Sequence, residues 1–384
     1  MTGPLTLSQE ETLFRDEVAR FSQKIIAPHV QSMDENQRIE PGILKAMSEM
    51  GLLGIEIEEK YGGAAGSFFM SCLAVEEISK VDPAVGVLCD VQNTLINTII
   101  RKYANPDQKQ KLLPRLASGE ISAYCLTESH SGSDAFALKT KATDSGDHWL
   151  LEGEKIFITN AMEANIFVVF ANINPKLGYK GITAFIVERG MDGFKVGKKE
   201  DKMGIRASST CELIFNKVKL PKENVIGEIG KGYKISIDTL NEGRIGIGAQ
   251  LIGLAHGALA AAIKYSNERD QFGSKIKEFQ GMQFQIADMA TQLETARLLV
   301  YQSARLKDAN LPFIKEAAMA KYYSSQVAEN IASLSLEIFG GYGFVKEYPA
   351  EKFYRDAKIG KLYEGTSNMQ LQTIFKIIDS DGLG

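Results

Sequence analysis

Two stretches with helical periodicity enclose one that has the pattern of strands, and this order constrains the fold more than any other feature of the chain. Apolar residues recur every three or four positions from Phe14 to Ile25, after a capping box at residues 8–11, and we expect Pro28 to end this helix. The helical pattern continues to about residue 120. Further helices are expected at 41–50, 71–81 and 85–103.

Between about residue 121 and residue 220 the apolar runs become short. They are rich in β-branched and aromatic residues and are separated by Gly, Asn and Asp. Because no helical pattern lies between them, we expect a small antiparallel barrel or sandwich rather than βαβ units. The expected strands are 121–126, 149–159, 166–173, 182–187, 194–196 and 211–220.

A glycine-rich link at residues 227–232 returns the chain to helical periodicity. Apolar residues step by three and four from Met282 to Val300, and again from Phe313 to Ile338. Two long amphipathic helices in succession predict a helical bundle. We therefore expect an α+β protein with an N-terminal helical domain (1–120), a middle β domain (121–229) and a C-terminal domain that resembles a four-helix bundle (230–384).

Composition narrows the chemistry. The 384 residues carry a net charge of −4, whereas a nucleic-acid-binding protein typically has a basic surplus. The four cysteines form no C-x-x-C pair and the four histidines no H-E-x-x-H, so metal, thiol and disulfide chemistry are not expected. We see no apolar run of about 18 residues, and therefore expect no membrane span.

Three stretches are unlike ordinary core sequence: Tyr124–Asp134, Gly340–Phe344, and the segment from Arg355 to Asn368, which contains Tyr-Glu-Gly-Thr. Taken together and in this order, they resemble the acyl-CoA dehydrogenase family over nearly the whole chain. Within that family, four further stretches resemble the short/branched-chain (2-methylacyl-CoA) members: 93–98, 136–140, 178–181 and 240–244.

The resemblance implies oxidation of an acyl-CoA between Cα and Cβ to a trans-2-enoyl-CoA. This reaction needs a base for the α-proton and an acceptor for the β-hydride, and because no side chain accepts hydride an organic cofactor is required. In this family the cofactor is FAD, and the resemblance assigns the base to Glu364. Some relatives carry the base just before the residue that corresponds to Arg244, but here that position is Gly243.

The resemblance also implies a set of binding residues, with no metal among the ligands. Some of the FAD contacts, at Arg269, Gln280 and residues 337–341, are expected to reach the FAD of a neighbouring subunit. The FAD contacts are Tyr124, Leu126, Thr127, Gly132, Ser133, Phe157, Ile158, Thr159, Arg269, Gln280, Glu337, Ile338, Phe339, Gly340, Gly341, Thr366, Ser367 and Asn368. The acyl-CoA contacts are Ser133, Tyr179, Tyr233, Asn241, Glu242, Gly243, Arg244 and Gly365.

Two of these segments depart from the family pattern. His130 stands where relatives usually have glycine, so a positive φ there would strain the backbone. Phe157 replaces the tryptophan that is common beside the flavin.

The expected partners are electron-transfer flavoprotein as electron acceptor and three further copies of the chain in a homotetramer. A mitochondrial matrix location after removal of a transit peptide is expected, with the bacterial cytoplasm as the alternative. Other functions left open are a straight short-chain or isobutyryl-CoA dehydrogenase, the same site working as an enoyl-CoA reductase, an acyl-CoA oxidase, and a non-catalytic helical interaction module.

Overall fold

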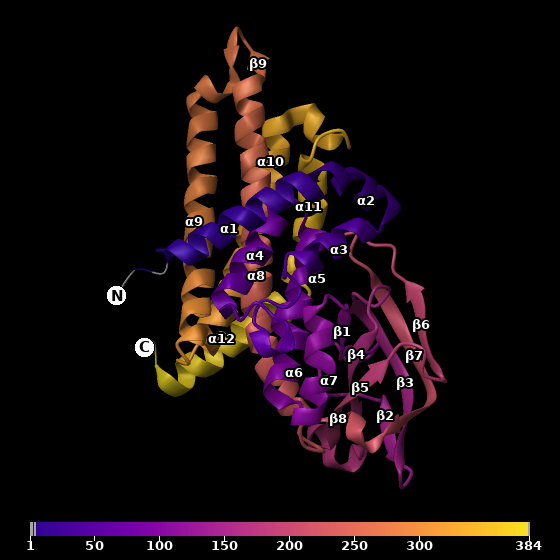
Figure 1. The fold of residues 1–384 in the computed structure, drawn as a ribbon. Coiled ribbons are helices and arrows are strands. Elements are labelled where there is room, and N and C mark those ends of the chain that lie inside the picture. The colour runs from indigo at the N-terminus through magenta and orange to yellow at the C-terminus, as the bar shows by residue number, and fades with distance from the viewer. Residues whose placement is uncertain (1–2, 4, 383–384) are drawn as a thin grey trace.

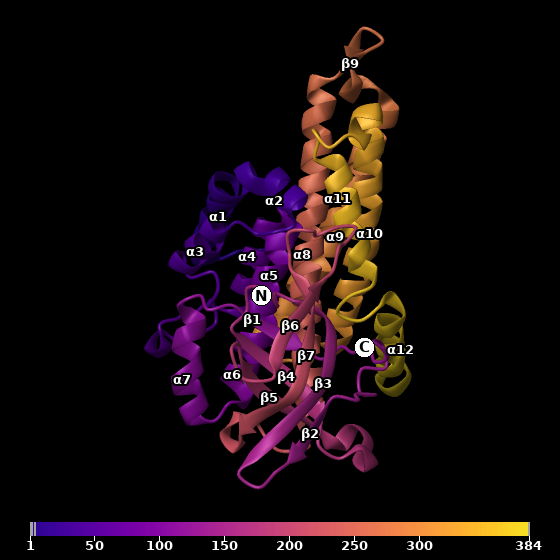
Figure 2. The same ribbon diagram turned by 90° about the vertical axis from the view of Figure 1, so that its right-hand side faces the viewer.

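The computed structural model describes residues 3 and 5–382, which form a helical region, a β-sheet and a second helical region arranged along one long helix, α8 (Gly232–Glu268). In Figure 1 the sheet lies at the lower right, and α8 runs upward from beside it to the hairpin that contains β9. Figure 2 shows the N-terminal helices on one side of α8 and the remaining C-terminal helices on the other.

The N-terminal region is helical, as the periodicity predicts, but Pro28 does not end its first helical stretch. The chain passes from α1 through a π turn (Ser22–Ile26) and a 3₁₀ turn (Ala27–His29) directly into α2. Pro28 lies in the first turn of the 3₁₀ segment, and the backbone stays right-handed helical on both sides of it, at Ile26 and Val30. The helices are α1 (Gln9–Phe21), α2 (Val30–Asn36), α3 (Pro41–Glu49), α4 (Phe68–Ser79), α5 (Pro83–Asp90), α6 (Thr98–Tyr103) and α7 (Pro106–Ala117).

The middle region is an eight-stranded sheet in the order β6-β7-β3-β2-β4-β5-β8, with β1 paired to β4. Most pairs are antiparallel, as expected, but β1 and β2 both run parallel to β4. The sequence pattern misses β2 and β8, because one is polar and mostly exposed and the other has two residues. The strands are β1 (Ser122–Cys125), β2 (Lys141–Asp144), β3 (His148–Thr159), β4 (Ile166–Asn172), β5 (Ile182–Glu188), β6 (Phe194–Lys199), β7 (Thr210–Pro221) and β8 (Val225–Ile226).

The C-terminal region contains the two long amphipathic helices expected from the sequence, α9 and α10, which pack beside α8. By length and composition α8 is apolar enough to cross a membrane, but 83% of its most apolar window is buried inside the protein, as in a core helix. The elements are α8, β9 (Asp270–Gln271), β10 (Ser274–Lys275), α9 (Gln280–Asp308), α10 (Ile314–Phe339), α11 (Ala350–Ala357) and α12 (Ser367–Asp381).

Glycines on α8 allow the N-terminal helices to approach its backbone. A Cβ at Gly253 would lie 2.4 Å from the carbonyl oxygen of Glu76, and one at Gly257 would lie 2.2 Å from that of Lys80. A Cβ at Gly246 would lie 1.8 Å from Asp90 Oδ1, so no larger residue fits there without movement. The small residues Gly246 and Gly248 therefore serve close packing of α8 against its neighbours.

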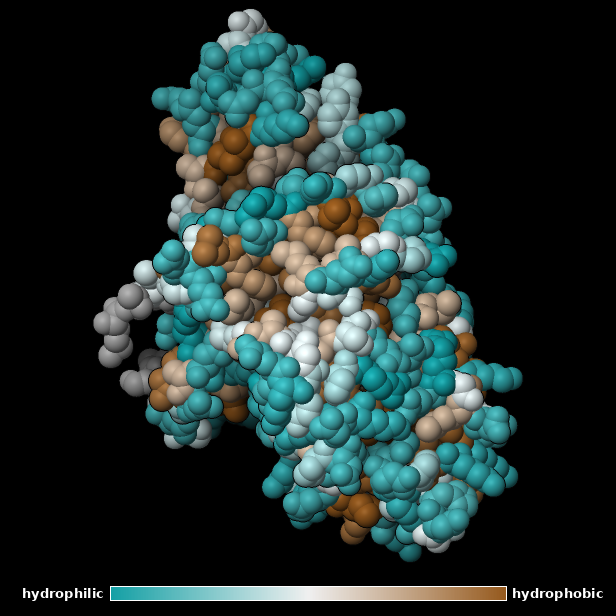
Figure 3. Space-filling model, viewed as in Figure 1, coloured by the Kyte–Doolittle hydropathy of each residue, from teal (hydrophilic) through white to brown (hydrophobic). Residues whose placement is uncertain are grey.

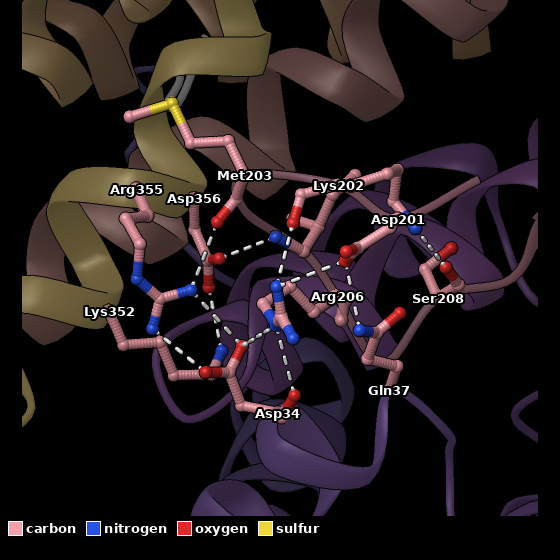
Figure 4. A network of polar contacts seen from close by, with 12 residues as sticks. Asp34, Gln37, Asp201, Lys202, Met203, Arg206, Ser208, Lys352, Arg355 and Asp356 are labelled. Atoms are coloured by element: carbon pink, nitrogen blue, oxygen red, sulfur yellow. Dashed lines mark hydrogen bonds and ion pairs between the residues drawn. The ribbon is translucent and has the colours of Figure 1, made fainter. Parts of the chain in front are cut away.

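Ion pairs join the three regions at one place (Figure 4). The guanidinium of Arg355 on α11 lies 2.8 Å from Asp34 Oδ2 on α2, and Arg206, which precedes β7, donates from Nε to the Asp34 carbonyl oxygen at 3.2 Å. Close by, Lys352 Nζ lies 2.6 Å from Asp356 Oδ2, and Asp356 accepts the backbone N–H of Ile205, which has a φ of 41°. These contacts hold a strained β-branched residue in place.

Replacing Arg355 by methionine should lower the free energy of unfolding by about 3 kcal/mol, because it leaves Asp34, which is 6% exposed, without its main counter-ion. Chemical denaturation measures the difference. The matched control is Arg20→Met, which removes an ion pair between two exposed side chains and should change stability by less than about 1 kcal/mol. Equal effects of the two substitutions would contradict the structural role of this network.

Candidate active site

Glu364 lies on a tight turn between the 3₁₀ segment Lys358–Lys361 and α12. Its φ is 50°, and Gly365 follows with a φ of 87°. A left-handed conformation at a non-glycine residue is unfavourable and persists only when its surroundings hold it. Here Gln370 Nε2 donates to the carbonyl oxygens of Glu364 and Gly365 at 3.1 and 2.9 Å, and Lys321 Nζ donates to that of Gly365 at 2.6 Å.

The Glu364 carboxyl group is directed toward α8. A Cβ at Gly243 would lie 3.2 Å from Glu364 Oε2, and this oxygen is buried with no hydrogen-bond partner among the described residues. Burial raises the pKa of Glu364 to about 7, against the opposing charges of Lys321 and Arg244. A carboxyl group with a pKa near neutrality is suited to removing a proton from a weak carbon acid.

Asp90, at the end of α5, is a second carboxyl group near this position. It is fully buried, accepts a hydrogen bond from Thr94 Oγ1 at 2.9 Å and lies against Gly246 of α8. Burial, and then the charge of Glu364, raise the pKa of Asp90 well above its ordinary value. Both carboxyl groups therefore hold a proton more strongly than a carboxyl group in water does. Sequence reasoning missed it, although an acidic residue in an otherwise apolar helical run was a signal.

The loop expected to contact the flavin is anchored by a buried ion pair. Lys155 on β3 is fully buried, and its Nζ donates to the Leu126 carbonyl oxygen at 2.9 Å and to Glu128 Oε1 at 2.7 Å. Ile156 N–H donates to the Thr127 carbonyl oxygen at 3.0 Å. These contacts bring the loop at 126–133 beside residues 157–159, so both groups of predicted flavin contacts from the β domain lie together.

Phe157 lies at an irregularity in β3. The register of β3 against β7 shifts between Lys155 and Ile158, Phe157 has a φ of 57°, and its side chain is 59% exposed. Such bulges redirect a side chain and are frequent beside active sites. His130, in contrast, has no positive φ, and it lies in a turn closed by two backbone hydrogen bonds between Glu128 and Ser131. The strain considered for His130 is therefore absent.

The predicted acyl-CoA contacts gather around the first half of α8. Tyr179 and Tyr233 meet edge to face with centroids 4.9 Å apart, and Arg244 donates to Asn241 Oδ1 at 2.9 Å. Glu242 is directed elsewhere: it is buried and pairs with Lys102 and Lys307. Tyr124, a predicted flavin contact, is linked to Ser236 of α8 by a 2.8 Å hydrogen bond between their hydroxyl groups.

The remaining predicted FAD contacts lie elsewhere. A groove of about 810 Å³ next to the β9 hairpin is lined by Arg269, Ile338 and Phe339 together with Gly340 and Gly341. Gln280 begins α9 nearby, and the main-chain carbonyl oxygen of Glu337 accepts a hydrogen bond from the backbone N–H of Gly340. Open space surrounds Gly340 and Gly341, so backbone is accessible beside an arginine, a donor set that fits the phosphates and ribose of a dinucleotide.

In Figure 1 the β9 hairpin, which the groove adjoins, lies at the top of the molecule, well apart from the sheet that carries the flavin loop. Thr366, Ser367 and Asn368 form the N-terminus of α12 directly after Gly365, and Ser367 Oγ has no hydrogen-bond partner among the described residues. The separation fits the expectation that Arg269, Gln280 and residues 337–341 contact the FAD of a neighbouring subunit.

Comparison with known proteins decides the family. Family models for the N-terminal, middle and C-terminal domains of acyl-CoA dehydrogenase match residues 8–120, 123–218 and 230–378. The chain belongs to the acyl-CoA dehydrogenase family. It is therefore an FAD-dependent oxidoreductase with the three-domain α+β fold expected from the sequence.

Three similar proteins illustrate the relationship. The short/branched chain specific acyl-CoA dehydrogenase of Rattus norvegicus, named as mitochondrial, is 52% identical over 98% of this chain and 87% of its own length. The structure of butyryl-CoA dehydrogenase from Megasphaera elsdenii has a TM-score of 0.96 at 42% identity, covering 97% of this chain and 99% of that one. A glutaryl-CoA dehydrogenase from Mycobacterium smegmatis, solved in complex with FADH2, has a TM-score of 0.93 at 29% identity, covering 100% and 99% of the two chains.

Glu364→Gln should make the FAD-saturated protein more stable at pH 8 and leave its stability unchanged near pH 4. Folding raises the pKa of Glu364 from 4.5 to about 7, so the wild-type protein loses stability as the pH rises through this interval, while glutamine does not ionise. We expect a gain of about 3 kcal/mol at pH 8, measured by urea denaturation at both pH values. A wild-type protein that is the more stable one at pH 8 would contradict a buried Glu364 carboxylate.

Proposed function

We propose that this chain oxidises short/branched-chain acyl-CoA of the 2-methylbutyryl type to the trans-2-enoyl-CoA, with Glu364 as the base. The observation that carries the proposal is the unpartnered, buried Oε2 of Glu364 beside Gly243. A base carried at position 243, as in some relatives, would occupy this same space. Because Gly243 has no side chain, the Glu364 carboxyl group can occupy this space.

In the proposed reaction, different residues of the chain act on the proton, the flavin and the acyl-CoA. Glu364 removes the α-proton, and its backbone N–H, which donates to no described residue, is free to bind the thioester oxygen and stabilise the charge that develops there. FAD, when bound, supplies the acceptor for the β-hydride. The loop at 126–133 and residues 157–159 hold the flavin ring, and Tyr179, Tyr233 and Arg244 are placed on the acyl-CoA side.

The substrate assignment is supported by the 52% identity to the short/branched chain specific relative from Rattus norvegicus. The straight short-chain alternative has its own support in the 42% identity to the butyryl-CoA dehydrogenase of Megasphaera elsdenii. The same groups also catalyse the reverse reaction, so an enoyl-CoA reductase needs no different site. Membership of an enzyme family weighs against a non-catalytic helical module.

Electron-transfer flavoprotein is the proposed electron acceptor and a homotetramer the proposed assembly. Large apolar side chains stand exposed on the C-terminal helices, as a single chain of an oligomer would show: Phe284 is 67% and Phe375 is 65% exposed. Figure 3 shows apolar areas below the β9 tip and across the middle of one face. The mitochondrial name of the relative from Rattus norvegicus supports a location in the mitochondrial matrix.

Glu364→Gln should retain stoichiometric FAD and lose α-proton exchange, because glutamine keeps the shape of the side chain but cannot accept the proton. Exchange is measured as deuterium incorporation at Cα of 2-methylbutyryl-CoA in D₂O. Glu10→Gln, an exposed residue in the first turn of α1, serves as the matched control and should exchange at the wild-type rate. Wild-type exchange in the Glu364 variant would refute its role as the base.

The substrate proposal predicts that kcat/KM decreases in the order 2-methylbutyryl-CoA, isobutyryl-CoA, butyryl-CoA. The three are compared as competing substrates with electron-transfer flavoprotein as the acceptor. A preference for butyryl-CoA would move the assignment to the straight short-chain group while leaving the base untouched.

A further inference from the structure

We propose that Lys321 and Gln370 are positioning residues for Glu364, which lock its turn from two sides while the ammonium group of Lys321 supplies the charge that favours the carboxylate. The proposal rests on the proposed role of Glu364 as the base. Neither side chain is expected to touch the substrate, because both are fully buried behind the turn and bind its carbonyl oxygens.

The first observation is the geometry of the turn. Glu364 and Gly365 have φ values of 50° and 87° in succession, and their two carbonyl oxygens receive three hydrogen bonds from Lys321 and Gln370. The fit is close, since a Cβ at Gly365 would lie 2.7 Å from Gln370 Nε2. A left-handed conformation is unfavourable for a glutamate, and the three hydrogen bonds offset that cost.

The second observation is that Lys321 differs from the other buried lysines. Lys155 has Glu128 at 2.7 Å and Lys352 has Asp356 at 2.6 Å, whereas no carboxylate among the described residues lies within ion-pair distance of Lys321. Burying an ammonium group without a counter-ion is expensive. The acid whose charge acts on Lys321 is Glu364 itself, so the charge of Lys321 acts on the base.

The charged and titratable groups around Glu364 come from four elements. Lys321 on α10 and Arg244 on α8 favour its carboxylate. Burial raises the pKa of Asp90 on α5, which favours its neutral form, and the phenol groups of Tyr124 on β1 and of the adjacent Tyr363 also have raised pKa values. Lys321 and Arg244 are therefore the two charges that oppose the effect of burial on the pKa of Glu364.

Two substitutions separate the charge from the mechanical support. Lys321→Met removes both, so we expect the apparent pKa of Glu364 to rise by about one unit and kcat at pH 7 to fall about tenfold, with partial recovery at higher pH. Gln370→Met removes two hydrogen bonds and no charge. We therefore expect kcat to fall by the same factor at every pH, while the pKa of Glu364 and the KM stay as in the wild type. Lys321→Arg keeps the charge and should keep the wild-type pKa.

The test combines pH profiles of kcat with an infrared titration of the FAD-loaded protein. The protonated carboxyl band that disappears in Glu364→Gln reports the pKa of Glu364 without turnover, so it tests Lys321 even where the assignment of the base fails. Lys264→Met, an exposed lysine on α8, is the matched control.

Three results would overturn the proposal. One is an unchanged infrared pKa together with unchanged kcat in Lys321→Met. Another is a pKa shift in Gln370→Met as large as that in Lys321→Met. The third, which holds even where Lys321→Met does not fold, is wild-type kcat in Gln370→Met.

Discussion

The close approach of α8 to the N-terminal helices is the constraint on which the rest of the structure depends. Gly253 and Gly257 let α8 touch the backbone of α4, and Gly246 and Gly243 make room for Asp90 and Glu364 farther along the helix. A methyl group at any of these four positions would collide with its neighbour unless the backbone or a side chain moved. The glycines thus set both the packing of the regions and the space that holds Glu364, the proposed base.

This arrangement gathers unfavourable groups in one place. Glu364 has both a buried carboxyl group and a left-handed backbone conformation. The buried Lys321, which has no close counter-ion, binds the same turn. Natural proteins keep such features where function needs them and support them from elsewhere. In this chain the support comes from the hydrogen bonds of Gln370 and from ion pairs such as Arg355 with Asp34, which fix α11 just before the turn.

The sequence predicts the long elements well and the tertiary contacts poorly. Periodicity locates α9 and α10, because amphipathic helices carry their burial pattern in the chain, but it misses β2, whose residues are polar and held by their neighbours. Glu364 is found through its motif. Lys321 is not, because it lies some forty residues away within an apolar helical pattern, and only folding shows that it is buried beside the turn.

The central claim is that one positioned glutamate, together with FAD, suffices for the chemistry. Anaerobic titration of the purified protein with 2-methylbutyryl-CoA, followed by the visible absorbance of the flavin, tests it most directly. We predict a yellow protein that bleaches in proportion to its FAD content, and a Glu364→Gln variant that remains yellow. A colourless wild-type protein with no affinity for FAD, or a variant that bleaches as fast as the wild type, would contradict the account.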